Sequence, residues 1–231
     1  MSPEARGGFT LSGSRALGCL LVHGLTATAE EMRPLGEALA ARGFPVHAVC
    51  LAGHGTDLAS LARARWADWF ASVSEGLARL RPEAPRIAVA GMSLGGLLAL
   101  HLAATHPAAV AALVLCGTPI QLSGARFRWL PILARLPFVA RRYATIPKVN
   151  GKPDIADPVM RAASQSYPAV PLPAVLELLR SELGSRSIET HVLERSWHVV
   201  TLDYDRDEVA RLAAAFLDRV AAEAAPAGRP A

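Results

Sequence analysis

A serine framed by glycines constrains the fold of this 231-residue chain more than any other feature. The motif is Gly91-Met92-Ser93-Leu94-Gly95-Gly96, between an apolar run at residues 87–90 that predicts a buried strand and a run at 97–104 that predicts a helix. In so tight a turn, the positions two before and two after the serine have almost no room for a side chain, and both are glycine. A strand, Gly-x-Ser-x-Gly and a helix in this order predict a nucleophile elbow, which lifts the serine hydroxyl above the sheet. The alternative is an ordinary glycine-rich strand-to-helix turn.

Composition and charge favour one enzyme-sized globular domain. The chain is 52% hydrophobic but only 6% aromatic, so its core is built from alanine, leucine and valine. The net charge of +4 comes from scattered arginines. The sequence has no compact basic run with interleaved aromatics, so nothing in it indicates nucleic-acid binding. The N-terminus has no apolar signal core behind it, and Cys19, Cys50 and Cys116 lie in or beside apolar strand-like runs. We therefore predict a cytoplasmic protein with reduced thiols.

Residues 87–125 carry no charged side chain, which is a feature of membrane spans. Their pattern is strand, helix, strand, interrupted by two histidines and a proline. Strands of a parallel sheet are buried on both faces and read as continuous apolar runs. We therefore interpret this stretch as buried core and not as a membrane span.

Alternating strands and helices predict a doubly wound, mostly parallel α/β sheet. Strands are expected at residues 16–22, 44–50, 87–90, 109–116 and 188–193, and helices at 64–81, 97–104, 174–183 and 205–222. A further helix is expected to begin at a capping box, Thr28 to Glu31, and to end near Gly43. The predicted organisation is a core of residues 1–117 and 174–223, a lid or cap insertion at 118–173, and a disordered tail at 224–231.

A serine nucleophile needs a base within hydrogen-bond reach, and the chain has seven histidines. His47 and His191 lie inside predicted strands, and His101 and His106 lie on or just after the helix that follows the elbow. His54, between glycines, could line the pocket. His198 lies in a loop ahead of the last helix, where the chain order of nucleophile, acid and histidine places the base. We predict that His198 is the base.

An oxyanion hole needs two backbone N–H groups aimed at the position where negative charge develops. We expect one N–H from Leu94, directly after the serine, and the other from Leu25 in the loop His23-Gly24-Leu25-Thr26.

These motifs, together with Gly53-His54-Gly55-Thr56 and the segment Ser196 to Asp205, resemble the α/β-hydrolase superfamily, and within it the bacterial carboxylesterase and monoacylglycerol lipase group. The resemblance covers nearly the whole chain from Phe9 to Val220. It implies an α/β-hydrolase fold and hydrolysis of a small-molecule ester or monoacylglycerol with a medium or long acyl group. It implies an acyl-enzyme intermediate and no metal or organic cofactor. Residues 126–142 of the lid mix arginines with bulky apolar residues, which suits transient contact with a lipid interface and equally an ordinary solvated basic face.

The chain departs from this family where the third catalytic residue should be. The family places an acid after the penultimate strand, and only residues 181–187 stand between the helix beginning at Ala174 and the strand beginning near Ile188. We therefore predict that one strand-helix unit is missing near the C-terminus, and the triad acid is unassigned. Asp203 is a weak candidate for a substitute acid, and further candidates are Glu189, Glu194 and Asp205, with solvated or helix-capping carboxylates as the alternative. The rival functions are a catalytically silent hydrolase that binds a hydrophobic small molecule, and a thioesterase or acyltransferase on the same fold.

Overall fold

The computed structural model describes residues 7–118, 145–147, 155–164, 169–171, 191 and 193–223. Its main sheet has the strand order β1-β3-β2-β4-β5. The strands are β1 (Phe9–Leu11), β2 (Leu17–Val22), β3 (Val46–Val49), β4 (Arg86–Met92) and β5 (Val110–Cys116). β1 pairs antiparallel with β3, and the other three pairings are parallel. The prediction of a mostly parallel α/β sheet is confirmed.

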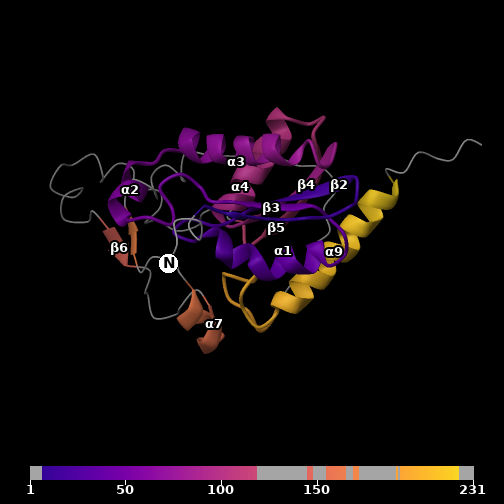
Figure 1. Ribbon diagram of the computed structural model, residues 1–231. Coiled ribbons are helices and arrows are strands. Elements are labelled where there is room, and N and C mark those ends of the chain that lie inside the picture. The colour runs from indigo at the N-terminus through magenta and orange to yellow at the C-terminus, as the bar shows by residue number, and fades with distance from the viewer. Residues whose placement is uncertain are drawn as a thin grey trace, which may run out of the picture.

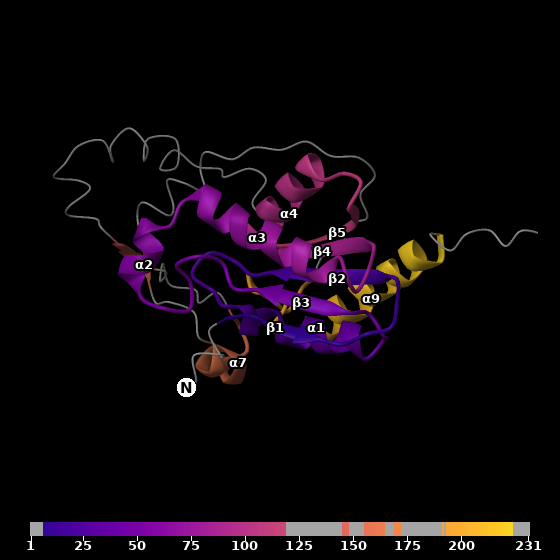
Figure 2. The ribbon, with the colours of Figure 1, turned by 45° about the horizontal axis from the view of Figure 1, so that its top comes forward.

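Helices cover both faces of the sheet (Figure 1). One face carries α3 (Trp66–Leu80) and α4 (Leu94–Thr105), and the other carries the 3-10 helix η2 (Ala29–Met32), α1 (Arg33–Ala40) and α9 (Arg206–Glu223). Figure 2 shows the same two layers from a second direction, with α2 (Leu58–Arg63) at one end of the sheet. Each layer buries its own apolar cluster against the sheet. This two-sided burial explains why the strands read as continuous apolar runs.

β5 is one of the two edge strands of the described sheet, and β1 is the other. All residues of β2 and β3 are buried, whereas β5 is half-buried and Leu115 is 38% exposed. The helix predicted at 174–183 lies outside the described residues. Of the predicted strand 188–193 only His191 and Leu193 are described, and neither lies in a strand, so the prediction is wrong for these two positions. The loss of a strand-helix unit stays a prediction.

The helix after β2 begins differently from the prediction. Thr28 makes no side-chain cap hydrogen bond, a 3-10 turn follows, and α1 begins only at Arg33. Glu31 does not reach back to Thr28 as a capping box requires. Its carboxylate is buried and accepts a hydrogen bond from Ser164 Oγ at 3.0 Å. A contact with a segment 133 residues away therefore overrides the local capping signal.

Within its described residues, the predicted insertion contains a second, two-stranded sheet and a short helix. β6 (Thr145–Pro147) pairs antiparallel with β7 (Ala169–Pro171), β7 contacts α2, and α7 (Pro158–Ala163) lies between them in the chain. The basic segment 126–142 and the tail 224–231 lie outside the described residues. We refer to residues 155–164, which include α7, as the cap segment. Within the described ranges, none of the helices combines the length and apolar character that crossing a membrane requires.

The three cysteines are free thiols, as predicted. Burial raises the pKa of Cys19 to about 12 and that of Cys116 to about 11. Both thiols are therefore protonated at neutral pH, and they pack as small apolar side chains.

Candidate active site

Ser93 has the strained backbone that the elbow motif predicts. Its φ is 53° and its ψ is −116°, a left-handed combination that L-residues rarely adopt. Neighbouring chain holds it there, because the Ser93 N–H donates to the Cys116 carbonyl at 2.8 Å and the Ser93 carbonyl accepts from Gly96 N–H at 3.0 Å. The elbow is thus fixed between the end of β5 and the first turn of α4.

The three glycines of the motif are required by close approach of other atoms. A Cβ on Gly91 would lie 2.3 Å from the Gly95 carbonyl oxygen, and a Cβ on Gly95 would lie 2.1 Å from the Val22 carbonyl oxygen. A Cβ on Gly96 would lie 1.8 Å from Thr118 Oγ1. Real Cβ atoms essentially never come so close, and the atoms that face Gly91 and Gly95 are backbone atoms, so these two positions must be without side chains. The atoms that face Gly96 belong to the Thr118 side chain, which would have to move to make room.

His198 is the histidine that the fold brings to the serine. Its Nε2 lies 3.0 Å from Ser93 Oγ, although the two residues are 105 positions apart in the chain. The Nδ1 edge of the ring lies against Gly117, where a Cβ would sit 3.4 Å from Nδ1. Gly117 follows β5 directly and has a φ of +53°. The end of β5 therefore supports both the serine, through Cys116, and the imidazole, through Gly117.

The two predicted oxyanion donors flank the same serine. Leu94 begins α4, where the first N–H groups of a helix have no partner inside the helix. Leu25 lies in the loop after β2, and the preceding Gly24 approaches so closely that its Cβ would be 3.3 Å from Ser93 Cβ. Within the described chain, neither the Leu25 N–H nor the Leu94 N–H donates a hydrogen bond. As far as the described residues go, both N–H groups could therefore donate to a ligand beside Ser93.

His23, the first residue of this loop, has a structural role that the sequence did not predict. Its side chain is fully buried, its Nδ1 lies 2.8 Å from the Gly24 carbonyl, and its Nε2 accepts from Leu51 N–H at 3.1 Å. These contacts assign a neutral ring with the proton on Nδ1. His54, which by its sequence position could line the pocket, is buried with its ring centroid 4.9 Å from that of His23. His23 thus ties the Leu25 loop to the chain that follows β3.

The stability of the fold should fall in mild acid because of His23. Burial, together with the nearby His54, lowers the pKa of His23 to about 3, although the bond to Gly24 opposes this. Between about pH 6.5 and pH 3 the unfolded chain binds a proton here that the folded chain does not, so stability is lost as pH falls. We expect this one group to contribute a slope of about 1.4 kcal/mol per pH unit between pH 6 and 4. In urea unfolding, the slope of stability against pH should be smaller in His23→Gln than in wild type by about this amount, while the contribution of His47, whose pKa burial also lowers, stays in both.

The exposed His106 provides the control for this experiment. The variant His106→Gln should keep the wild-type pH dependence of unfolding. An identical slope in wild type and His23→Gln would contradict the assignment of His23 as a buried neutral ring.

The candidate acids are engaged elsewhere than at His198. Asp203 is fully buried, and all of its carboxylate hydrogen bonds within the described chain are with backbone N–H groups. Asp205 accepts from Arg195 Nε at 2.9 Å, Glu194 is exposed, and Glu189 lies outside the described residues. The geometry therefore does not support Asp203 as an acid hydrogen-bonded to the imidazole, and the triad acid stays unassigned. No group of three His, Cys, Asp or Glu side chains suited to a metal ion occurs among the described residues.

Comparison with known proteins places this site in a family. The family model described as "Serine aminopeptidase, S33" (Hydrolase_4) matches residues 14–175. The chain belongs to this family of α/β-hydrolases. It falls in the group of carboxylesterases and monoacylglycerol lipases, as the resemblance indicated.

The relatives of this α/β-hydrolase are similar over most of their length. A protein named thermostable monoacylglycerol lipase from Bacillus sp. (strain H-257) is 33% identical over 221 residues, which is 82% of this chain and 86% of the relative. A carboxylesterase of Bacillus subtilis (strain 168) is 26% identical over 87% of this chain and 92% of its own. Among solved structures, a metagenome-derived lipolytic enzyme from the work on LipS and LipT has a TM-score of 0.79 at 24% identity, covering 93% of this chain and 98% of that one. This last likeness supports the α/β-hydrolase fold.

Proposed function

We propose that this protein is a serine carboxylester hydrolase that works through an acyl-enzyme, with Ser93 as nucleophile and His198 as general base. The observation that carries the proposal is the 3.0 Å contact between His198 Nε2 and Ser93 Oγ at a strained elbow. A serine hydroxyl is a weak nucleophile by itself, and an imidazole within hydrogen-bond reach removes its proton as it attacks. The exposure of His198 leaves it open to solvent and to a substrate.

The chemical steps follow from this pair. Ser93 Oγ forms a bond to the acyl carbon while its proton passes to His198 Nε2, and the Leu25 and Leu94 N–H groups bind the resulting oxyanion. The oxyanion then collapses to a carbonyl, the C–O bond to the alcohol breaks, and His198 gives its proton to the departing alcohol oxygen. A water molecule attacks the acyl-enzyme with His198 again as base, which releases the carboxylic acid and restores Ser93.

We assign the substrate class from the relatives. The relative with 33% identity is named a monoacylglycerol lipase and another a carboxylesterase, which supports a carboxylic ester, monoacylglycerols included, as the substrate. A medium or long acyl group is the further expectation from the family resemblance. The family description also names an aminopeptidase, so amides must be compared with esters.

A substrate panel tests the proposed function. Purified protein would be assayed with para-nitrophenyl acetate, butyrate, octanoate and dodecanoate, with 1-monooleoylglycerol, and with the para-nitroanilides of leucine and proline. We expect ester hydrolysis with the highest kcat/KM on the octanoate or dodecanoate, release of oleate from the monoacylglycerol, and no more than trace anilide cleavage. Preferential cleavage of the anilides would replace the esterase proposal by a peptidase. A folded protein that cleaves none of the panel would favour the silent binder of a hydrophobic small molecule.

A further inference from the structure

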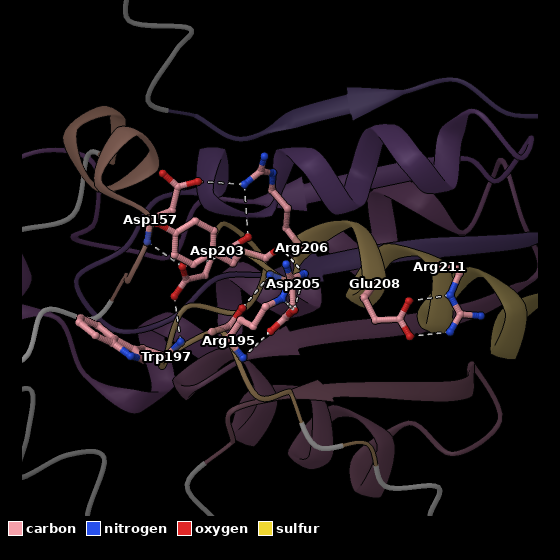
Figure 3. Close-up of polar contacts among 10 residues, drawn as sticks. Asp157, Arg195, Trp197, Asp203, Asp205, Arg206, Glu208 and Arg211 are labelled. Carbon is pink, nitrogen blue, oxygen red and sulfur yellow. Dashed lines mark hydrogen bonds and ion pairs between the residues drawn. The ribbon is translucent and has the colours of Figure 1, made fainter.

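Asp203 is a carboxylate whose placement neither the elbow nor the oxyanion hole explains. It lies between His198 and the start of α9, with a side chain that is 0% exposed. Its Oδ2 accepts from the Trp197 and Ala156 N–H groups, each at 2.8 Å, and its Oδ1 accepts from the Asp157 and Tyr204 N–H groups, each at 2.9 Å. Figure 3 shows Asp203 between Trp197 on one side and Asp157 on the other.

This carboxylate is stabilised as an anion. Burial alone would raise the pKa of Asp203, but the four backbone N–H donors outweigh burial and hold its pKa below the usual value. Because each oxygen accepts two N–H groups, an asparagine amide could not replace the carboxylate. Its NH2 group would face two donors and accept from neither. The side chain is therefore specific to an aspartate and is not a general filler of the loop.

The four donors belong to two segments that are far apart in the sequence. Trp197 and Tyr204 lie in the loop that carries His198. Ala156 and Asp157 lie near the start of the cap segment, 47 and 46 positions before Asp203. A second carboxylate also holds this loop, because the N–H and the Nε of Arg195 both donate to the carboxylate of Asp205. Trp197 directly precedes His198, and its N–H donates to the same oxygen, Asp203 Oδ2, as the N–H of Ala156 in the cap segment.

The cap side of this junction is itself braced. The Asp157 carboxylate accepts from the Val159 and Met160 N–H groups and so caps the start of α7. Its other oxygen lies 3.3 Å from Arg206 Nη1, and the same Nη1 lies 3.3 Å from the Asp203 backbone carbonyl (Figure 3). Loss of the Asp157 side chain should loosen the two cap amides that Asp203 holds.

We propose that Asp203 is a positioning residue that joins the cap segment to the histidine loop, so that the placement of His198 depends on how the cap segment is seated. This inference rests on the proposed function for its effect on catalysis. Displacement of a catalytic group by about 1 Å lowers rates by on the order of 100-fold. Asp203 therefore acts on the reaction through His198, without touching substrate.

A mutant cycle with a short substrate tests the coupling. Para-nitrophenyl acetate has an acyl group too short to use a cap for binding, so effects on its kcat report on His198. We expect Asp203→Asn to lower kcat about 100-fold with KM changed less than threefold. Asp157→Ala should lower kcat by roughly tenfold in the wild-type background and by less than twofold in the Asp203→Asn background. Independent, multiplicative effects of the two substitutions would overturn the coupling.

Asp218→Asn is the matched control, since Asp218 is a half-buried aspartate on α9 that pairs with Arg15 and Arg42. It should lower the thermal midpoint without lowering kcat at a temperature where every variant is folded. An equal loss of kcat in this variant would mean that general destabilisation, and not positioning, explains the effect of Asp203.

Hydrogen exchange provides a readout that needs no activity. The Trp197 N–H should exchange at least tenfold faster in Asp203→Asn, and also faster in Asp157→Ala, whereas Asp218→Asn should leave it unchanged. An unchanged Trp197 amide in Asp157→Ala would refute the junction. If wild type hydrolyses no ester, the proposed function fails, and the exchange rates still decide whether Asp203 couples the two segments.

Discussion

Replacing His198 by alanine is expected to reduce kcat for para-nitrophenyl octanoate by at least 10⁴-fold, with a similar loss for Ser93→Ala. The reason is the 3.0 Å contact, through which the proposed base and the proposed nucleophile would act together. The double variant Ser93→Ala/His198→Ala should therefore lose no more than the worse single variant, because neither group works without the other. Steady-state kinetics of the three variants, with folding checked by circular dichroism, make this measurement.

The exposed His106 again supplies the control, and His106→Ala should keep wild-type kcat. A loss below tenfold in His198→Ala would contradict its role as base. The size of the loss also bears on the unassigned acid. Where an acid orients the histidine, its removal alone costs on the order of 10⁴ in kcat. An imidazole without that support should therefore show a much smaller loss on substitution than one that has it.

The second large effect is on stability, and it concerns Gly95. Alanine is about 1 kcal/mol better than glycine inside a helix, and Gly95 is in the first turn of α4, so propensity alone predicts stabilisation. The added Cβ would however lie 2.1 Å from the Val22 carbonyl oxygen and 2.7 Å from that of His23. Both are backbone atoms at or just after the end of β2, which cannot move without displacing the loop that carries Leu25. We expect the clash to win and Gly95→Ala to lower the free energy of unfolding by about 3 kcal/mol.

Thermal unfolding measures this effect as a drop of about 6–12 °C in Tm for a chain of this size. Gly36→Ala in α1 is the matched substitution, because its nearest neighbours are side-chain atoms of Phe9 and Leu21 at 3.0 to 3.1 Å. Side-chain ends can adjust where a backbone carbonyl cannot, so Gly36→Ala should change stability by less than about 1 kcal/mol. Equal changes in the two variants would refute the close-approach explanation for the elbow glycines.

Much of the core could be predicted because its signals are local and continuous. The strands near Ser93 could be predicted from their continuous apolar runs. Such runs result from burial on both faces of the sheet, and every residue of β2 is buried. The pairing of Ser93 with His198 was also accessible, because the ends of parallel strands and the loops that follow them gather at one edge of the sheet. The fold and the two principal side chains follow from these patterns.

The contacts of Asp203 and His23 could not be predicted in the same way. Their partners are mainly backbone N–H and C=O groups, which every residue type supplies, so no residue pattern marks them. Glu31 shows the same limit of local patterns. Its spacing from Thr28 predicts a capping box, but its carboxylate instead accepts from Ser164, a distant residue of the cap segment. The hydrophobic pattern of the sequence therefore predicts the layers of this fold. The backbone hydrogen bonds around the site can be found only from the structure.

Covalent labelling with a fluorophosphonate tests most directly whether His198 activates Ser93. The probe forms a bond to a serine oxygen only when a base assists, so it reports on the pair without assuming the natural ester. Intact mass and peptide mapping should show one adduct, on Ser93, in wild type, with no adduct in Ser93→Ala and labelling at least 100-fold slower in His198→Ala. A folded wild-type protein that takes up no probe at Ser93, or that labels equally fast without His198, would contradict the account.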